Sequence, residues 1–251
     1  MGRTFALILA LQSFAAGAAE INVVSSGGIR PPLDELAPQF ERASGHKVAL
    51  KFVVGARVKQ EVEAGAFDVV IAPTNTFEDL IKAGKVVAAT RIDVARAGVG
   101  VAVRAGAPKP DLASVDAFKR TLLGAKSVAY NREGTAGAYF VQLLERLQIT
   151  PEMQPKLKPT TGTDPARSSL ALVAKGEAEI AVAAIATLFA PGVDFAGPVP
   201  SALQSYTQFT AGVGSGAKEP QAASAWIKYI TAPAAAVAYR AKGMDPVVHR
   251  H

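Results

Sequence analysis

The 251-residue sequence contains no cysteine, which excludes disulfide bonds, thiol nucleophiles and thiolate metal sites. Histidine is scarce: His46 lies in a polar turn, and His249 and His251 lie in the last three residues. No His-Glu-x-x-His motif or similar ligand spacing occurs, so the sequence predicts neither a metal site nor a cofactor. The chain must therefore be stabilised by its core, and it is long enough for one large domain or two small ones.

The sequence also lacks an apolar run of the roughly 20 residues needed to cross a bilayer. Residues 5–11 are apolar, follow Arg3 and precede the small residues 16–19. This order is typical of a secretory signal peptide, so we expect residues 1–19 to be a leader that directs export to the periplasm. A buried N-terminal helix is the alternative. Because no cysteine follows the cleavage region, we expect no lipid or other membrane anchor.

Concentrated positive charge is a further absence. The formal net charge is +6, but lysine and arginine are scattered along the chain and form no run of four. Nucleic acid binding requires a basic stripe, so it is not expected. A mildly basic exported protein better fits a small anionic ligand.

Strand-like and helix-like segments alternate along the chain. The expected strands are residues 20–25, 48–54, 67–72, 99–104, 127–130, 179–184 and 206–213, and the expected helices are 31–40, 58–64, 76–83, 115–123, 136–147, 170–175, 221–231 and 233–242. This alternation predicts an α/β fold with mostly parallel sheets. Because the pattern restarts near residue 100, we expect two lobes with a ligand cleft between them. Lobe 1 would contain residues 20–100 and 208–251, and lobe 2 residues 101–207.

Small polar residues and glycines follow four of the predicted strands, at residues 25–28, 55–57, 73–76 and 131–137. Each turn presents free backbone N–H groups at a helix N-terminus, an arrangement that binds anions without a lysine. Thr74 and Thr135 add hydroxyl groups to these turns. A single such turn is equally well a structural helix cap. Four turns at the same ends of their strands favour a cleft that binds an anion.

The segments 21–28, 62–72, 172–178, 218–233 and 241–246 resemble the periplasmic molybdate-binding proteins of ABC transporters and their wider type II solute-binding relatives. The resemblance covers nearly the whole mature chain. It implies a two-lobed binding-protein fold and export. It also implies a receptor that captures a small anion and presents it to an ABC permease.

The resemblance further implies that hydroxyl groups and backbone amides hold the ligand. Ser25 or Ser26 fits the first contact, Ala136 the third, and Arg167 with Ser168 lies near the fourth. The second turn should read Ser-Ser-Gly, but the sequence has Gly55 followed by Ala and Arg. The tyrosine expected after the late strand is missing near residue 184.

Arginines stand where neutral donors are lost: Arg57 and Arg167 at or beside contact positions, and Arg30 after the first turn. Guanidinium groups match carboxylates bidentately. We therefore expect an organic carboxylate rather than molybdate or another oxyanion, although each arginine alone is also compatible with a solvated side chain. The predicted ligand-binding residues are Ser25, Ser26, Arg30, Gly55, Arg57, Thr74, Thr135, Ala136, Arg167 and Ser168.

An enzyme on the same scaffold is the second hypothesis. A few proteins similar to this family are aconitate isomerases, which move a proton and a double bond in a tricarboxylate. Such a reaction needs a base near the acidic C–H group. Tyr130, Glu133, Tyr139 and Asp164 are the candidates, but no arrangement in the sequence marks one of them, so no catalytic residue is assigned.

Overall fold

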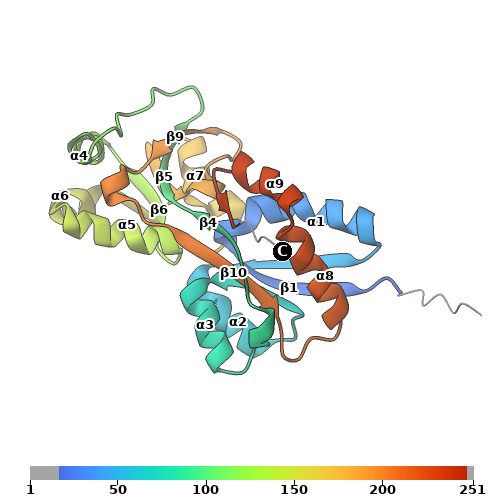
Figure 1. The fold of residues 1–251 in the computed structure, drawn as a ribbon. Helices are drawn as coiled ribbons and strands as arrows, with labels where there is room; N and C mark the ends of the chain where they lie inside the picture. The colour runs from blue at the N-terminus through green and yellow to red at the C-terminus, as the bar shows by residue number, and fades with distance from the viewer. Residues whose placement is uncertain (1–16, 248–251) are drawn as a thin grey trace, which may run out of the picture.

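The computed structural model describes residues 17–247. The predicted leader therefore lies almost entirely outside the described residues, and so do His249 and His251. The described chain forms two β-sheets, each flanked by helices (Figure 1). Across residues 17–247, no helix has the length and apolar character needed to cross a bilayer.

The first sheet has the strand order β11-β4-β10-β3-β1-β2. Its strands are β1 (Glu20–Ser26), β2 (Lys47–Val53), β3 (Val69–Pro73), β4 (Ile92–Ala97), β10 (Thr207–Val213) and β11 (Asp245–Pro246). Strand β1 pairs in parallel with β2 and β3, whereas β10 runs antiparallel between β3 and β4.

The second sheet has the order β7-β6-β8-β5-β9. Its strands are β5 (Val99–Arg104), β6 (Val128–Asn131), β7 (Leu157–Thr160), β8 (Ile180–Ala184) and β9 (Val193–Pro198). Here β6 pairs in parallel with β7 and β8, and β5 runs antiparallel between β8 and β9. The predicted two-lobed α/β fold is confirmed, and the sheets are mixed because β5 and β10 insert antiparallel.

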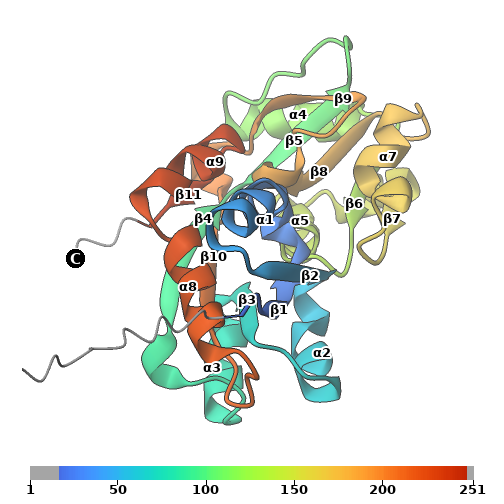
Figure 2. The same ribbon diagram turned by 90° about the vertical axis from the view of Figure 1, so that its right-hand side faces the viewer.

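The α-helices are α1 (Arg30–Ser44), α2 (Val58–Ala64), α3 (Thr74–Lys82), α4 (Val115–Gly124), α5 (Thr135–Arg146), α6 (Thr150–Met153), α7 (Ser169–Ala174), α8 (Pro220–Ile230) and α9 (Ala236–Ala241). Short 3-10 helices lie between several of the strands and helices, including η1 (Gly27–Ile29), η2 (Gly55–Arg57) and η6 (Ile185–Thr187). In Figure 2, β5, β8 and β9 lie in the upper half of the molecule, and β1, β2 and β3 in the lower half.

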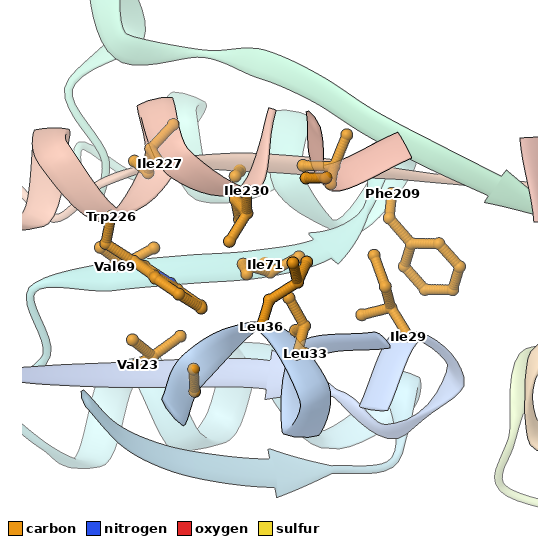
Figure 3. Packing of buried hydrophobic residues seen from close by; sticks show 14 of the residues in the cluster. Val23, Ile29, Leu33, Leu36, Val69, Ile71, Phe209, Trp226, Ile227 and Ile230 are labelled. Carbon is orange, nitrogen blue, oxygen red and sulfur yellow. The ribbon is translucent and has the colours of Figure 1, made fainter. Parts of the chain in front are cut away.

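Alternating side chains of the first sheet enter two apolar layers, as expected for strands buried on both faces. Val23 and Ile71 contribute to the layer formed with α1, α8 and α9, whereas Val24 and Val70 contribute to the layer formed with α2 and α3. Figure 3 shows Trp226 of α8 among the side chains of the larger layer, and its indole is fully buried. These two layers fix the positions of the turns that follow the strands.

The second sheet is covered in the same way. Helices α4, α5 and α6 pack on one face through residues such as Phe118 and Phe140, and α7 packs on the other face through Val173. On the α7 side the sheet presents mainly alanines, including Ala102, Ala129 and Ala181. Their small side chains allow the short helix to lie close to the strands.

The chain passes between the sheets twice. Strand β4 ends at Ala97 and β5 begins at Val99, so Gly98 alone separates the two sheets on the outward path. The return path runs from the end of β9 to the start of β10 at Thr207. These crossovers lie beside the predicted boundaries at residues 100 and 208. That each half moves as a unit stays a prediction.

Candidate functional site

The strand orders indicate where a ligand site should lie. In the first sheet, β2 lies on one side of β1 and β3 lies on the other. In the second sheet, β7 and β8 flank β6 in the same way. Open α/β sheets bind ligands at such switch points, outside the carboxyl ends of the strands. The ends of β1 and β6 are Ser26 and Asn131.

A cavity of about 720 Å³ lies at these strand ends, between the two halves of the molecule. Ser26 and Asn131 both line it, together with Gly55 after β2, Gly162 after β7 and Ala184 at the end of β8. The cavity is therefore built from both sheets, at the place that the strand order predicts.

Ser26, Gly55 and Thr135 meet at one point of the cavity wall, which we call the cradle. A Cβ atom placed on Gly55 would lie 3.0 Å from Thr135 Oγ1 and 3.9 Å from Ser26 Oγ. The glycine thus leaves room between two hydroxyl groups, one from each half of the molecule. Ser26 is 3% exposed, and its Oγ accepts from Gly28 N at 3.5 Å, which positions the hydroxyl group.

Two helices begin at the cavity. The first residue of α1, Arg30, lines it, and so do Thr135, Ala136 and Gly137 in the first turn of α5. No described side chain caps either helix at its N-terminus. The first N–H groups of a helix lack intrahelical partners and carry partial positive charge. The start of α5 therefore offers backbone donors suited to an anion, whereas at α1 Arg30 N donates to Gly27 O and residues 31 and 32 are prolines without N–H groups.

Close packing fixes the start of α5. A Cβ atom on Gly137 would lie 1.8 Å from the carbonyl oxygen of Asn131, so only glycine fits where the helix begins against the end of β6. The turn is tied further by Glu133 N, which donates to Asn131 Oδ1 at 3.0 Å. The donors of the α5 N-terminus are therefore held in place before any ligand arrives.

Ionisable side chains on the cavity wall are mostly cationic. Arg30, Lys175 and Lys242 line it, and Asp34 is the carboxylate among the described lining residues. Arg30 Nε donates to Asp34 Oδ2 at 3.0 Å, and its guanidinium group also lies over the ring of Phe52. The balance of charge on the wall is positive and favours an anionic ligand.

Six of the ten sequence-predicted ligand-binding residues line this cavity: Ser26, Arg30, Gly55, Thr135, Ala136 and Ser168. Three of the four predicted anion-binding turns, at residues 25–28, 55–57 and 131–137, contribute to it. Ser168 Oγ also caps α7 by accepting from Ala171 N at 3.2 Å. The structure thus brings these residues together, and their contacts with a ligand stay a prediction.

The structure places the other four away from the cavity wall. Ser25 is fully buried, and its hydroxyl group donates to Ser26 O. Thr74 Oγ1 lies 2.8 Å from Thr210 Oγ1, within the first sheet's half. Arg167 is exposed and does not line the cavity. Arg57 donates from Nη2 to Glu133 Oε1 at 2.9 Å, so its guanidinium group is engaged by the other half of the molecule.

The candidate bases lie outside the lining residues as well. Glu133 Oε2 accepts from Gly162 N at 2.9 Å. This hydrogen bond and the Arg57 guanidinium lower the pKa of Glu133, although partial burial opposes them. Tyr139 donates to Leu203 O, and Tyr130 packs against Phe140 in the core. Asp164 is exposed and also does not line the cavity.

Sequence reasoning missed the two lysines on the wall. Lys175 ends the helical segment 170–175, and Lys242 lies in the segment 241–246, which carries part of the family resemblance. That motif was the available signal for Lys242, but the sequence does not show that the C-terminal turn reaches the cavity.

Two α/β halves, joined by two crossovers and enclosing a cavity at their strand ends, define a class of proteins that hold a ligand between lobes. A family model described as bacterial extracellular solute-binding protein matches residues 21–245. The chain belongs to this family.

Two characterised relatives differ in what they do. The chain is 33% identical over 238 residues to an aconitate isomerase from Pseudomonas sp., covering 90% of this chain and 88% of the relative. It is 31% identical over 247 residues to the molybdate-binding protein ModA of Azotobacter vinelandii, covering 95% and 94%.

A solved structure of an Azotobacter vinelandii periplasmic molybdate-binding protein superposes with a TM-score of 0.75 at 20% identity. The match covers 92% of this chain and all of that one. At this identity the likeness establishes the fold and leaves the ligand open.

Proposed function

We propose that the protein is a periplasmic receptor that captures a small organic anion bearing carboxylate groups and presents it to an ABC permease. The observation that carries this proposal is the cradle. Two hydroxyl groups, one from each half, flank Gly55, and the start of α5 adds backbone donors to the wall, so one anionic group can contact both lobes at once. A ligand held in this way favours the closed arrangement of the lobes.

The size and chemistry of the cavity favour an organic anion over a compact oxyanion. The cavity, of about 720 Å³, has room for a small organic anion. Leu170, Val182 and Phe209 provide apolar wall that suits a carbon skeleton. The resemblance to molybdate-binding proteins implies a tyrosine near residue 184. That residue is alanine, so no phenol hydroxyl group is available there.

The test is a thermal-shift and calorimetry screen of the mature protein against succinate, tricarballylate, aconitate, sulfate and molybdate. A ligand at 100 times its Kd should stabilise the folded state by about 2.7 kcal/mol. We expect carboxylates to produce this shift and molybdate to bind weakly. A dissociation constant for molybdate below the micromolar range would contradict the proposal.

Replacing Gly55 with alanine tests the cradle itself. The new Cβ atom would occupy the space between Thr135 Oγ1 and Ser26 Oγ, so we expect carboxylate affinity to fall at least about tenfold. The melting temperature without ligand should change little, since the nearest atom belongs to a side chain that can move. Gly124→Ala is the matched control because a Cβ atom there meets nothing within 4 Å.

An isomerase is the second candidate, and the 33% identity to an aconitate isomerase is the observation that favours it. Incubating the protein with cis-aconitate in D₂O and following the vinyl proton by NMR separates the two functions. A receptor leaves the spectrum unchanged. Conversion to the trans isomer at a rate proportional to protein concentration would replace the receptor proposal with the enzyme.

A further inference from the structure

Lys242 enters the cavity wall from the C-terminal part of the chain. It follows α9 in a tight turn, in which Lys242 N and Met244 N both donate to Tyr239 O at 3.0 Å. Met244 is 2% exposed and packs in the core of the first sheet. The backbone that carries the Lys242 side chain is therefore firmly held.

Gly243 brings this turn against the other half of the molecule. Its φ angle is +63°, and a Cβ atom there would lie 2.6 Å from Ile185 Cγ2 of η6. Any other residue would push the turn away from η6, because both the left-handed backbone and the space favour glycine. Lys242 thus belongs to the first sheet's half but lies where that half contacts the second.

The ammonium group of Lys242 has no acceptor among residues 17–247, unlike the other two cations on the wall. Arg30 pairs with Asp34, and Lys175 Nζ donates to Ala166 O at 3.3 Å. A lysine of the cavity wall whose ammonium group has no such acceptor is available to a ligand carboxylate, and hydrogen bonds between charged groups are the stronger kind.

Lys242 and the cradle are separate parts of the wall. The atoms nearest to Cβ positions at Gly27, Gly28 and Gly55 come from Ser26, Val53, Pro73, Thr135, Thr163 and Phe209, and none comes from the C-terminal turn. The turn instead adjoins Ile185 and Phe189. A compact anion held at the cradle would leave Lys242 unused.

We infer that Lys242 forms a second anion-binding pole of the site. The cavity then selects carbon skeletons with carboxylates at both ends, that is, dicarboxylates or tricarboxylates, over monocarboxylates and compact oxyanions. This inference rests on the proposed carboxylate receptor. It adds a specificity-determining residue that belongs to none of the anion-binding turns.

Calorimetry with glutarate and butyrate, which share a short carbon chain but differ in one carboxylate, tests the inference. The wild-type protein should bind glutarate more tightly. Lys242→Met keeps the length of the side chain and removes its charge, so glutarate affinity should fall ten- to a hundredfold, on the order expected for a charged hydrogen bond. Butyrate affinity should not change.

Lys228→Met is the matched control, because Lys228 is exposed on α8 of the same half and does not line the cavity. It removes the same charge and should leave both affinities unchanged. Equal wild-type affinity for glutarate and butyrate, or an equal loss of both in Lys242→Met, would overturn the second pole while the receptor stands. Failure of every carboxylate to bind would overturn the proposed function together with the pole.

Discussion

Arg57 has a different role in the structure from the one that its place in the sequence predicts. Arg57 ends the second turn and was expected to bind a ligand carboxylate. In the structure its partner is Glu133, a carboxylate of the other half that is also anchored by Gly162 N. The pair therefore joins the two halves beside the cavity, which favours the closed arrangement.

Glu133→Gln tests this link. The glutamine oxygen can still accept from Gly162 N, but the amide nitrogen that replaces Oε1 cannot accept from Arg57. We expect the ligand to dissociate about two- to fivefold faster, the effect of one exposed ion pair, with little change in the melting temperature of the ligand-free protein. Stopped-flow measurement of ligand release checks the rate. Glu78→Gln is the control, since its pair with Arg91 lies within the first half.

The direction of the Glu133 pKa shift sets the pH dependence of the same link. Because the folded pKa is lowered, the carboxylate stays charged and the pair is complete above about pH 4.3, the ordinary value for glutamate. The link is lost only as the pH falls through the lower folded value.

The outcome that would contradict the link between the halves is tighter carboxylate binding in Glu133→Gln. It would mean that the variant frees Arg57 to bind the ligand.

At the scale of elements, strands and helices with strong local patterns were predictable. The helix at residues 58–64 and the strand at 99–104 coincide with α2 and β5, and most other boundaries differ by one to three residues. Burial on both faces explains this, since strands such as β3 are continuous apolar runs that resemble no loop.

The strands β4, β7 and β9 were not predicted, and each lacks such a run. β7 contains Pro159, which removes a ladder donor and is tolerated because β7 is an edge strand. β9 is the opposite edge and contains Asp194 and Gly197. β4 contains Asp93 and Arg96 and is identified by its pairing with β10 and β11, strands distant in sequence. The same argument applies to Lys242, because only the folded chain brings α9 to the cavity.

At the scale of the whole molecule, the two halves have separate cores, and one side chain joins the crossovers between them. Gln204 Oε1 accepts from Val99 N at 2.7 Å, and Gln204 Nε2 donates to Val99 O at 2.9 Å. Val99 begins β5 on the outward path, and Gln204 lies on the return path. Gly98 makes room for this contact, since a Cβ atom there would lie 3.1 Å from Gln204 Oε1.

We predict that Gln204 sets the angle at which the halves meet. In Gln204→Leu, Val99 N loses its side-chain acceptor, whereas Val99 O keeps its hydrogen bond from Val199 N at 3.0 Å, so the protein should be destabilised by about 1–3 kcal/mol. The crossovers should also separate more freely, so small-angle scattering of the ligand-free variant should give a larger radius of gyration than wild type. A saturating carboxylate should close both proteins and remove the difference in radius of gyration. The variant should bind the carboxylate more weakly than wild type.

Gln208→Leu is the control, because the Gln208 amide nitrogen donates within the first sheet, to Ala95 O and Phe209 O. A lower melting temperature with unchanged radius and affinity would show that Gln204 stabilises the fold without setting the angle.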